Sequence, residues 1–168
     1  IIVLLFSIPV IIFSVGIIDD SIKISSLKKI LFQVVVAIFF IYSLQLYKIP
    51  TFPYFNNYIF NFIIEIIFIL GITNSINLID GIDYLSSGIS TLISISYIII
   101  FHLLGYNNPV FFYILIGCLL AHIVYNIFFV RVFLGDAGSL FLGWIFSVIS
   151  LLLIKESNNL FLPFVTFS

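Results

Sequence analysis

Long apolar runs separated by short polar stretches restrict this chain to one fold class. The runs approach the ~20 residues that an α-helix needs to cross a bilayer, and 63% of the 168 residues are hydrophobic while 8% are charged. Strands of a membrane β-barrel would be ~10 residues long with alternating apolar and polar side chains, whereas these runs are longer and apolar on every face. We therefore predict an all-α, polytopic transmembrane helix bundle.

The sequence predicts about six complete spans and a truncated seventh. The chain begins without Met and stops inside an apolar run, so we expect residues 1–168 to be a single integral membrane domain within a longer protein. The edges of the apolar runs give the predicted spans Ile1 to Ile18, Ile30 to Tyr47, Tyr58 to Ile72, Ile89 to Leu104, Val110 to Ile127, Leu140 to Ile154, and a seventh from Leu160.

Five of the seven acidic residues lie in three short polar islands between these spans. Ionised groups are costly near lipid, so their concentration suggests a site that binds a cation or performs chemistry. Each island taken alone is also compatible with a polar helix end or a capped turn. In the third, Ser139 is the expected N-cap of the helix from Leu140. The islands are Gly16 to Asp20, Asn74 to Asp83 and Phe133 to Ser139.

The basic residues indicate an orientation in the membrane. Loops after the first, third and fifth spans carry Lys23, Lys28, Lys29 and Arg131, whereas the other loops carry Lys48 and Lys155. Because cytoplasmic loops are enriched in Lys and Arg, the first set is predicted to be cytoplasmic, and all five aspartates lie on the same side. The net charge of −1 and the absence of a basic stripe argue against a nucleic-acid partner.

Taken together and in this order, the islands resemble the polyprenyl-phosphate N-acetylhexosamine-1-phosphate transferases of glycosyltransferase family 4. The resemblance runs from about Ser14 to Ile149. It rests on Asp-Asp after the first span, Asn-x-x-Asp-Gly-Ile-Asp after the third, Phe-Leu-Gly-Asp-Ala-Gly-Ser after the fifth, and the shorter matches Lys29-Ile-Leu-Phe-Gln33 and Tyr125-Asn126.

The resemblance implies a multi-pass enzyme of the cell membrane with a cytoplasmic active site. Such an enzyme transfers an N-acetylhexosamine 1-phosphate from a UDP-sugar to polyprenyl phosphate, releases UMP and initiates cell-envelope polysaccharide synthesis. Its expected partners are UDP-N-acetylhexosamine, polyprenyl phosphate and the lipid bilayer, with a homodimer left open. Mg²⁺, or Mn²⁺ in its place, would neutralise the two anionic substrates.

The resemblance also implies a role for each matching residue. Asp19, Asp20 and Asp136 would be catalytic, with Asp20 and Asp136 as Mg²⁺ contacts and Asp19 as the base for the lipid phosphate or as the nucleophile. The substrate-binding residues would be Lys29 as an anion clamp, Phe133 stacked on uracil, Asn126 on a phosphate, and Asn77, Asp80 and Asp83 on the nucleotide and diphosphate.

The chain departs from the family pattern where glycine usually follows the last aspartate of the second island, because Tyr84 stands there. The family's N-terminal spans and a C-terminal loop containing His are also absent from these residues. Glu65, His102 and His122 lie within spans, the two histidines away from the islands, and we expect all three to make contacts between helices.

Two alternatives stay open. The phospho-MurNAc-pentapeptide transferase of peptidoglycan synthesis shares the three islands, although the stretch from Gly135 to Gly143 is closer to the GlcNAc-type branch. A divalent-cation transporter would also need clustered carboxylates, but near the middle of the membrane on facing helices. The sequence therefore favours the enzyme.

Overall fold

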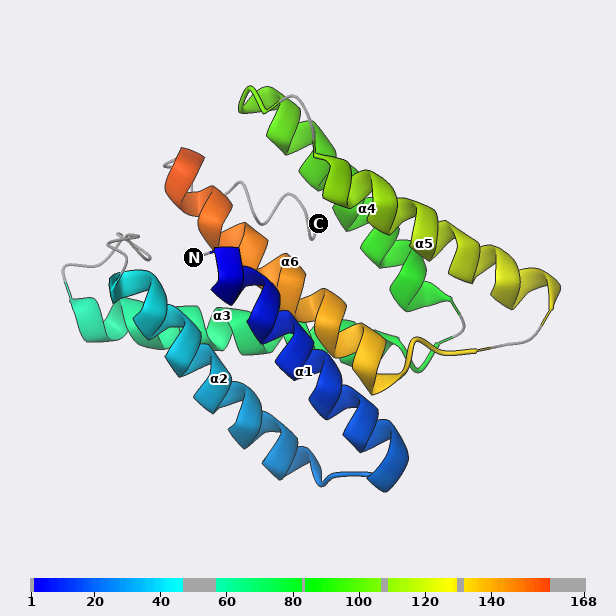
Figure 1. Ribbon diagram of the computed structural model, residues 1–168, viewed down its shortest axis with the longest axis horizontal. Helices are drawn as coiled ribbons and strands as arrows, with labels where there is room; N and C mark the ends of the chain where they lie inside the picture. Colours follow the sequence, from blue (N-terminus) through cyan, green and yellow to red (C-terminus); the bar gives the residue numbers. More distant parts are fainter. Residues whose placement is uncertain (1, 47–56, 83, 107–108, 130–131, 158–168) are drawn as a thin grey trace.

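In the computed structural model, the chain is a bundle of α-helices described over residues 2–46, 57–82, 84–106, 109–129 and 132–157 (Figure 1). Five helices, α2 to α6, are long and apolar enough to cross a membrane. The predicted all-α membrane bundle is confirmed, while the span predicted from Leu160 lies outside the described residues. The helices are α1 Ile2–Ile22, α2 Ser26–Leu46, α3 Tyr58–Ile79, α4 Leu85–Leu103, α5 Val110–Phe128 and α6 Gly135–Ser157.

Three helices continue into the polar islands, and the bounds predicted for them were wrong. α1 extends past Ile18 to Ile22, α3 past Ile72 to Ile79, and α6 begins at Gly135 instead of Leu140. Apolar runs mark only the part of a helix that faces lipid or core, whereas the polar side chains at these helix ends bind polar groups on other helices. Ser139 is consequently not an N-cap: it lies inside α6, where its hydroxyl donates to the Gly135 carbonyl at 2.7 Å.

Helix α6 is the centre of the bundle. In Figure 1 it passes between a group formed by α1, α2 and α3 and the antiparallel pair α4 and α5. Leu140, Trp144 and Val148 of α6 belong to the core shared with α1 and α2, whereas Leu142 and Phe146 belong to the core shared with α4 and α5. An apolar surface all round the helix is what this central position requires.

Two glycines allow α6 to approach its neighbours closely. A Cβ added to Gly16 of α1 would lie 2.3 Å from the Ala137 Cα, and one added to Gly143 of α6 would lie 2.6 Å from the Thr73 Cα on α3. Small residues at helix crossings are the usual means of close packing in membranes, where van der Waals contact drives association. These contacts fix the first turn of α6 against α1 and its third turn against α3.

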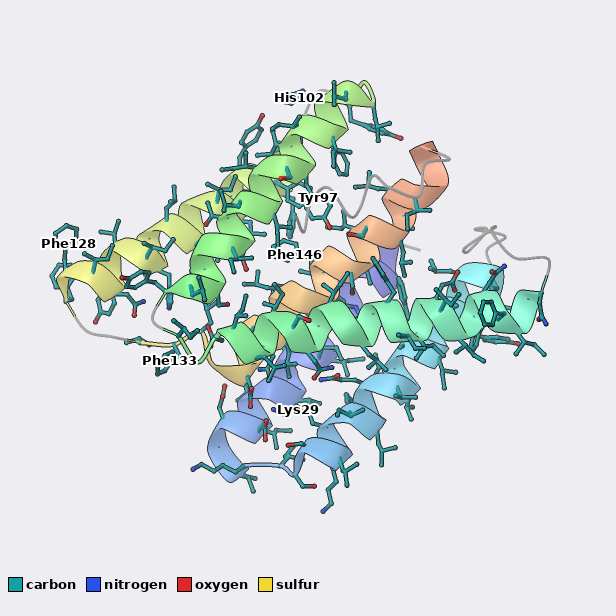
Figure 2. All side chains as sticks on the ribbon, turned by 180° about the vertical axis from the view of Figure 1, so that it is seen from behind. Lys29, Tyr97, His102, Phe128, Phe133 and Phe146 are labelled. Atoms are coloured by element: carbon teal, nitrogen blue, oxygen red, sulfur yellow. The ribbon has the colours of Figure 1, made fainter. Side chains whose placement is uncertain are left out.

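Polar contacts attach the remaining helices. The hydroxyl of Tyr97 on α4 donates to the Phe146 carbonyl of α6 at 2.8 Å, and Figure 2 shows the two residues facing each other. His102 of α4 lies 3.1 Å from the Tyr113 hydroxyl of α5, so the expected contact between helices is confirmed. Glu65 on α3 is 1% exposed, which confirms that it faces the bundle.

Tyr84 occupies a backbone conformation that favours glycine. It precedes α4 in the left-handed region with φ of 47° and ψ of 1°, and its side chain is 48% exposed. A residue with a Cβ loses roughly 1–2 kcal/mol in this region. The tyrosine therefore introduces strain where the resemblance places a glycine.

We expect Tyr84→Gly to raise the free energy of unfolding by about 1 kcal/mol, because the strain is relieved and little buried area is lost. Thermal unfolding of the detergent-solubilised protein would measure the change. Tyr84→Ala is the matched control, since alanine loses the same ring but keeps the strained Cβ. Equal stability of the Gly and Ala variants would contradict the prediction.

Candidate active site

The polar islands meet at one end of the bundle. The C-terminal ends of α1 and α3 and the N-terminal ends of α2 and α6 lie together at the lower right of Figure 1. Four of the five island aspartates, Asp19, Asp20, Asp80 and Asp136, join one network of contacts there. Asp83 lies outside the described residues. Carboxylates far apart in the sequence are thus brought together, as their shared loop parity predicts.

Lys29 is the cation at the centre of this network. Its Nζ lies 2.7 Å from Asp136 Oδ2 and also forms an ion pair with Asp19 Oδ2. The carboxylates of Asp19 and Asp136 thus share one ammonium group. Two like charges this close repel unless a cation compensates them. Lys29 supplies that compensation from the first turn of α2, and Figure 2 shows it between α1 and α2.

Asn77 adds a neutral donor on the opposite side of Asp136. Its Nδ2 donates to Asp136 Oδ1 and to the Ser139 hydroxyl, the latter at 2.8 Å. Asp136 is therefore held by α2 through one oxygen and by α3 through the other. Sequence reasoning did not give Ser139 a place in this site, because its spacing suggested a cap.

Asp80 follows the last turn of α3 and binds the chain that leads into α6. Its two oxygens accept from the backbone N–H groups of Leu134 at 3.4 Å and Gly135 at 2.9 Å. Burial raises the pKa of the Asp80 carboxyl above its usual value, while the two N–H groups act in the opposite direction.

Asp20 binds the next two backbone N–H groups. Asp20 Oδ1 accepts from Asp136 N at 2.9 Å and Oδ2 accepts from Ala137 N at 3.2 Å. Gly135 has φ of 72°, and a Cβ at this position would lie 2.8 Å from Asp20 Oδ2. Glycine therefore provides both the left-handed turn and the space for the carboxylate.

Asn126 and His122 of α5 form a polar group beside the connection into α6. Asn126 Oδ1 accepts from Val132 N at 2.7 Å, and its Nδ2 donates to the His122 carbonyl at 2.8 Å. His122 Nδ1 lies 2.8 Å from the Ser87 hydroxyl of α4, which confirms the expected contact between helices.

Phe133 lies between the residues held by Asn126 and Asp80, on the connection into α6. Its side chain is 51% exposed, and Figure 2 shows it on the side of the site away from Lys29. An exposed aromatic ring on a backbone with several fixed N–H groups is available to stack on a planar ligand. Its role as a uracil contact stays a prediction.

The arrangement can accept a divalent cation between two carboxylates. Among the described residues, no three His, Cys, Asp or Glu side chains are close enough together to hold a metal ion. Mg²⁺ commonly binds through one or two carboxylates plus substrate phosphates, and Asp19 and Asp136 form such a pair. Asp19 and Asp20 both use their two oxygens, Asp20 for two backbone N–H groups and Asp19 for the Ile24 N–H and Lys29. Asp19 is the one that already shares a cationic partner with Asp136.

Comparisons with known proteins show what the chain is similar to. Residues 1–154 match the model of glycosyl transferase family 4. The chain is 34% identical, over 90% of its length and 53% of the relative, to the phospho-N-acetylmuramoyl-pentapeptide-transferase of Staphylococcus saprophyticus. It is 35% identical, over 90% of its length and 44% of the relative, to the probable undecaprenyl-phosphate N-acetylglucosaminyl 1-phosphate transferase of Bacillus subtilis. The chain thus spans about half the length of the curated relatives that it matches.

Proposed function

Because the chain belongs to glycosyl transferase family 4, we propose that the protein transfers a sugar 1-phosphate from a UDP-sugar to polyprenyl phosphate at a membrane surface. In the overall reaction, one P–O bond to polyprenyl phosphate forms and the P–O bond to UMP breaks. The products are UMP and a polyprenyl diphosphate sugar. The donor that we propose is a UDP-N-acetylhexosamine, and the surface is the cytoplasmic one.

The observation that carries this proposal is the contact of Lys29 with both Asp19 and Asp136 at the ends of three helices. A cationic group between two carboxylates can exchange partners when an anionic substrate arrives, because the ammonium binds phosphate as readily as carboxylate. Lys29 would then hold a phosphate oxygen. Asp19, which is buried beside it, would accept the proton of the lipid phosphate.

A divalent cation, Mg²⁺ or Mn²⁺, belongs to the proposal. Held by Asp136, it would neutralise the diphosphate and stabilise the charge that develops as UMP leaves. Asn77 keeps Asp136 in place by donating to the Asp136 oxygen that Lys29 does not bind. Phe133 would position the uracil from the exposed side of the site.

Two observations support transfer over cation transport. The aspartates lie at helix ends, on one end of the bundle, instead of on facing helices at mid-membrane. The two relatives described above are, by name, transferases. The relatives do not agree on the sugar, so the choice between GlcNAc-type and MurNAc-pentapeptide-type donors depends on the assay.

The proposal is tested with membranes that contain the protein together with its native flanking sequence. We expect incubation with polyprenyl phosphate, Mg²⁺ and a panel of radiolabelled UDP-sugars to give a labelled lipid product and an equal amount of UMP. EDTA should stop the reaction, and Mn²⁺ should restore it. If none of the UDP-sugars, including UDP-MurNAc-pentapeptide, labels the lipid, the proposed transfer is wrong.

A further inference from the structure

We infer that Asp20, Asp80 and Asn126 are positioning residues that hold the backbone from Val132 to Ala137, called here the 132–137 segment. They set the direction of the two side chains that this segment offers to a ligand, Phe133 and Asp136. The effect of these residues on transfer rests on the proposed function, whereas their hold on the 132–137 segment does not. The resemblance gives these three residues a different role, in direct contact with metal or substrate.

Five of the six backbone N–H groups of this segment are bound by side chains from other helices. Asn126 of α5 binds the first, at Val132, over 2.7 Å. Asp80, at the end of α3, and Asp20 of α1 each bind two consecutive N–H groups, one with each carboxylate oxygen. These four groups belong to Leu134, Gly135, Asp136 and Ala137, at 3.4, 2.9, 2.9 and 3.2 Å.

These contacts supply hydrogen-bond partners to the N–H groups at the beginning of α6. The first N–H groups of an α-helix have no partner within the helix, and an acceptor close in sequence normally caps them. α6 is capped instead by carboxylates more than fifty residues away, since Asp80 and Asp20 are separated from their partners by 54 to 117 positions. Negative charge at this end also complements the helix dipole. The start of α6 therefore depends on α1 and α3 being in place.

The same contacts determine where Asp136 points. Its N–H group faces Asp20, while its carboxylate extends to Lys29 and Asn77. Main chain and side chain are thus fixed from opposite sides. Both oxygens of Asp20 are directed at α6 and not at Lys29, although Asp20 is adjacent to Asp19 in the sequence. The two neighbouring aspartates consequently have separate tasks: Asp19 faces the cation, and Asp20 holds the helix that carries Asp136.

Hydrogen exchange and enzyme kinetics together test this inference on the protein with its native flanking sequence. Asp20→Asn and Asp80→Asn replace one acceptor oxygen by an amide NH₂, which cannot accept the second N–H. Asp19→Asn is the matched control, because the adjacent Asp19 carboxylate binds Lys29 and the Ile24 N–H instead of a backbone N–H of the 132–137 segment. Exchange of the Leu134 to Ala137 N–H groups is measured by mass spectrometry, and the Mg²⁺ concentration for half-maximal transfer is measured alongside it.

We expect exchange in the segment to become at least about 10-fold faster in Asp20→Asn and Asp80→Asn and to stay unchanged in Asp19→Asn. The kcat should fall in both Asp20→Asn and Asp80→Asn. The Mg²⁺ concentration for half-maximal transfer should stay within about twofold of the value for the unmodified protein. Unchanged exchange would overturn the inference. A rise of about 10-fold or more in the Mg²⁺ requirement of Asp20→Asn, with activity restored by excess Mg²⁺, would also overturn it. The exchange result tests whether Asp20 and Asp80 hold the 132–137 segment, even if the unmodified protein shows no transfer.

Discussion

Replacing Asp136 by Asn is expected to lower the rate of transfer by about 10²-fold or more, because stabilisation of transition-state charge is worth several kcal/mol. Asp136 is the carboxylate that Lys29 and Asn77 both bind, and with Asp19 it forms the pair available to a divalent cation. Asn is neutral and offers a single oxygen. The loss should appear in kcat at saturating UDP-sugar and polyprenyl phosphate.

The fold should survive this change, because the contact between α6 and Asp20 uses the backbone N–H of residue 136 and not its side chain. Ser21→Ala is the matched control: Ser21 is exposed beside the same site, and its hydroxyl binds only its own helix, at the Ile17 carbonyl. It should retain full activity. A turnover of Asp136→Asn equal to that of Ser21→Ala at limiting Mg²⁺ would remove Asp136 from the chemistry.

Gly16→Ala is expected to lower the free energy of unfolding by about 1–3 kcal/mol, the usual cost of overpacking. The new Cβ would lie 2.3 Å from Ala137 Cα, 2.5 Å from Ala137 N and 2.7 Å from the Asp136 carbonyl oxygen. All three are backbone atoms, which cannot rotate away, so the first turn of α6 must move. Transfer should fall as well, because this turn carries Asp136 and donates two backbone N–H groups to Asp20.

Gly117→Ala in α5 is the matched control, since a Cβ there meets nothing within 4 Å. Alanine in a helix interior is favoured over glycine by ~1 kcal/mol, so this variant should be more stable than the unmodified protein. Chemical denaturation of both variants in detergent gives the comparison. The close approach of α1 and α6 would be wrong if the two substitutions changed stability in the same direction by the same amount.

Local features of the sequence were enough for the class of fold and for the composition of the site. Six apolar runs gave six helices, because a backbone in lipid must satisfy its hydrogen bonds within each segment. The loop parity of the islands correctly predicted that Asp19, Asp20, Asp80 and Asp136 lie at one end. Both conclusions depend on the length and order of segments along the chain, which sequence displays directly.

The helix ends were predicted less well, and the reason is the same at each. Polar residues such as Asn77 and Ser139 were placed outside the predicted spans, Ser139 as an N-cap, because they interrupt apolar runs. In the structure they are helical and bind partners on other helices. A partner distant in sequence leaves no local signal, so the bounds of α1, α3 and α6 could not be read from composition.

Which oxygen binds which group was decided by tertiary structure alone. Adjacent Asp19 and Asp20 are equivalent in the sequence, yet Asp19 pairs with Lys29 while Asp20 caps α6. Successive residues on a helix point in directions about 100° apart, so their roles depend on how α1 is rotated against α2 and α6. These helices are apolar on every side, and periodicity therefore cannot indicate that rotation. The sequence determined that these carboxylates share one end of the bundle; the close packing at Gly16 and Gly143 determined what each of them binds.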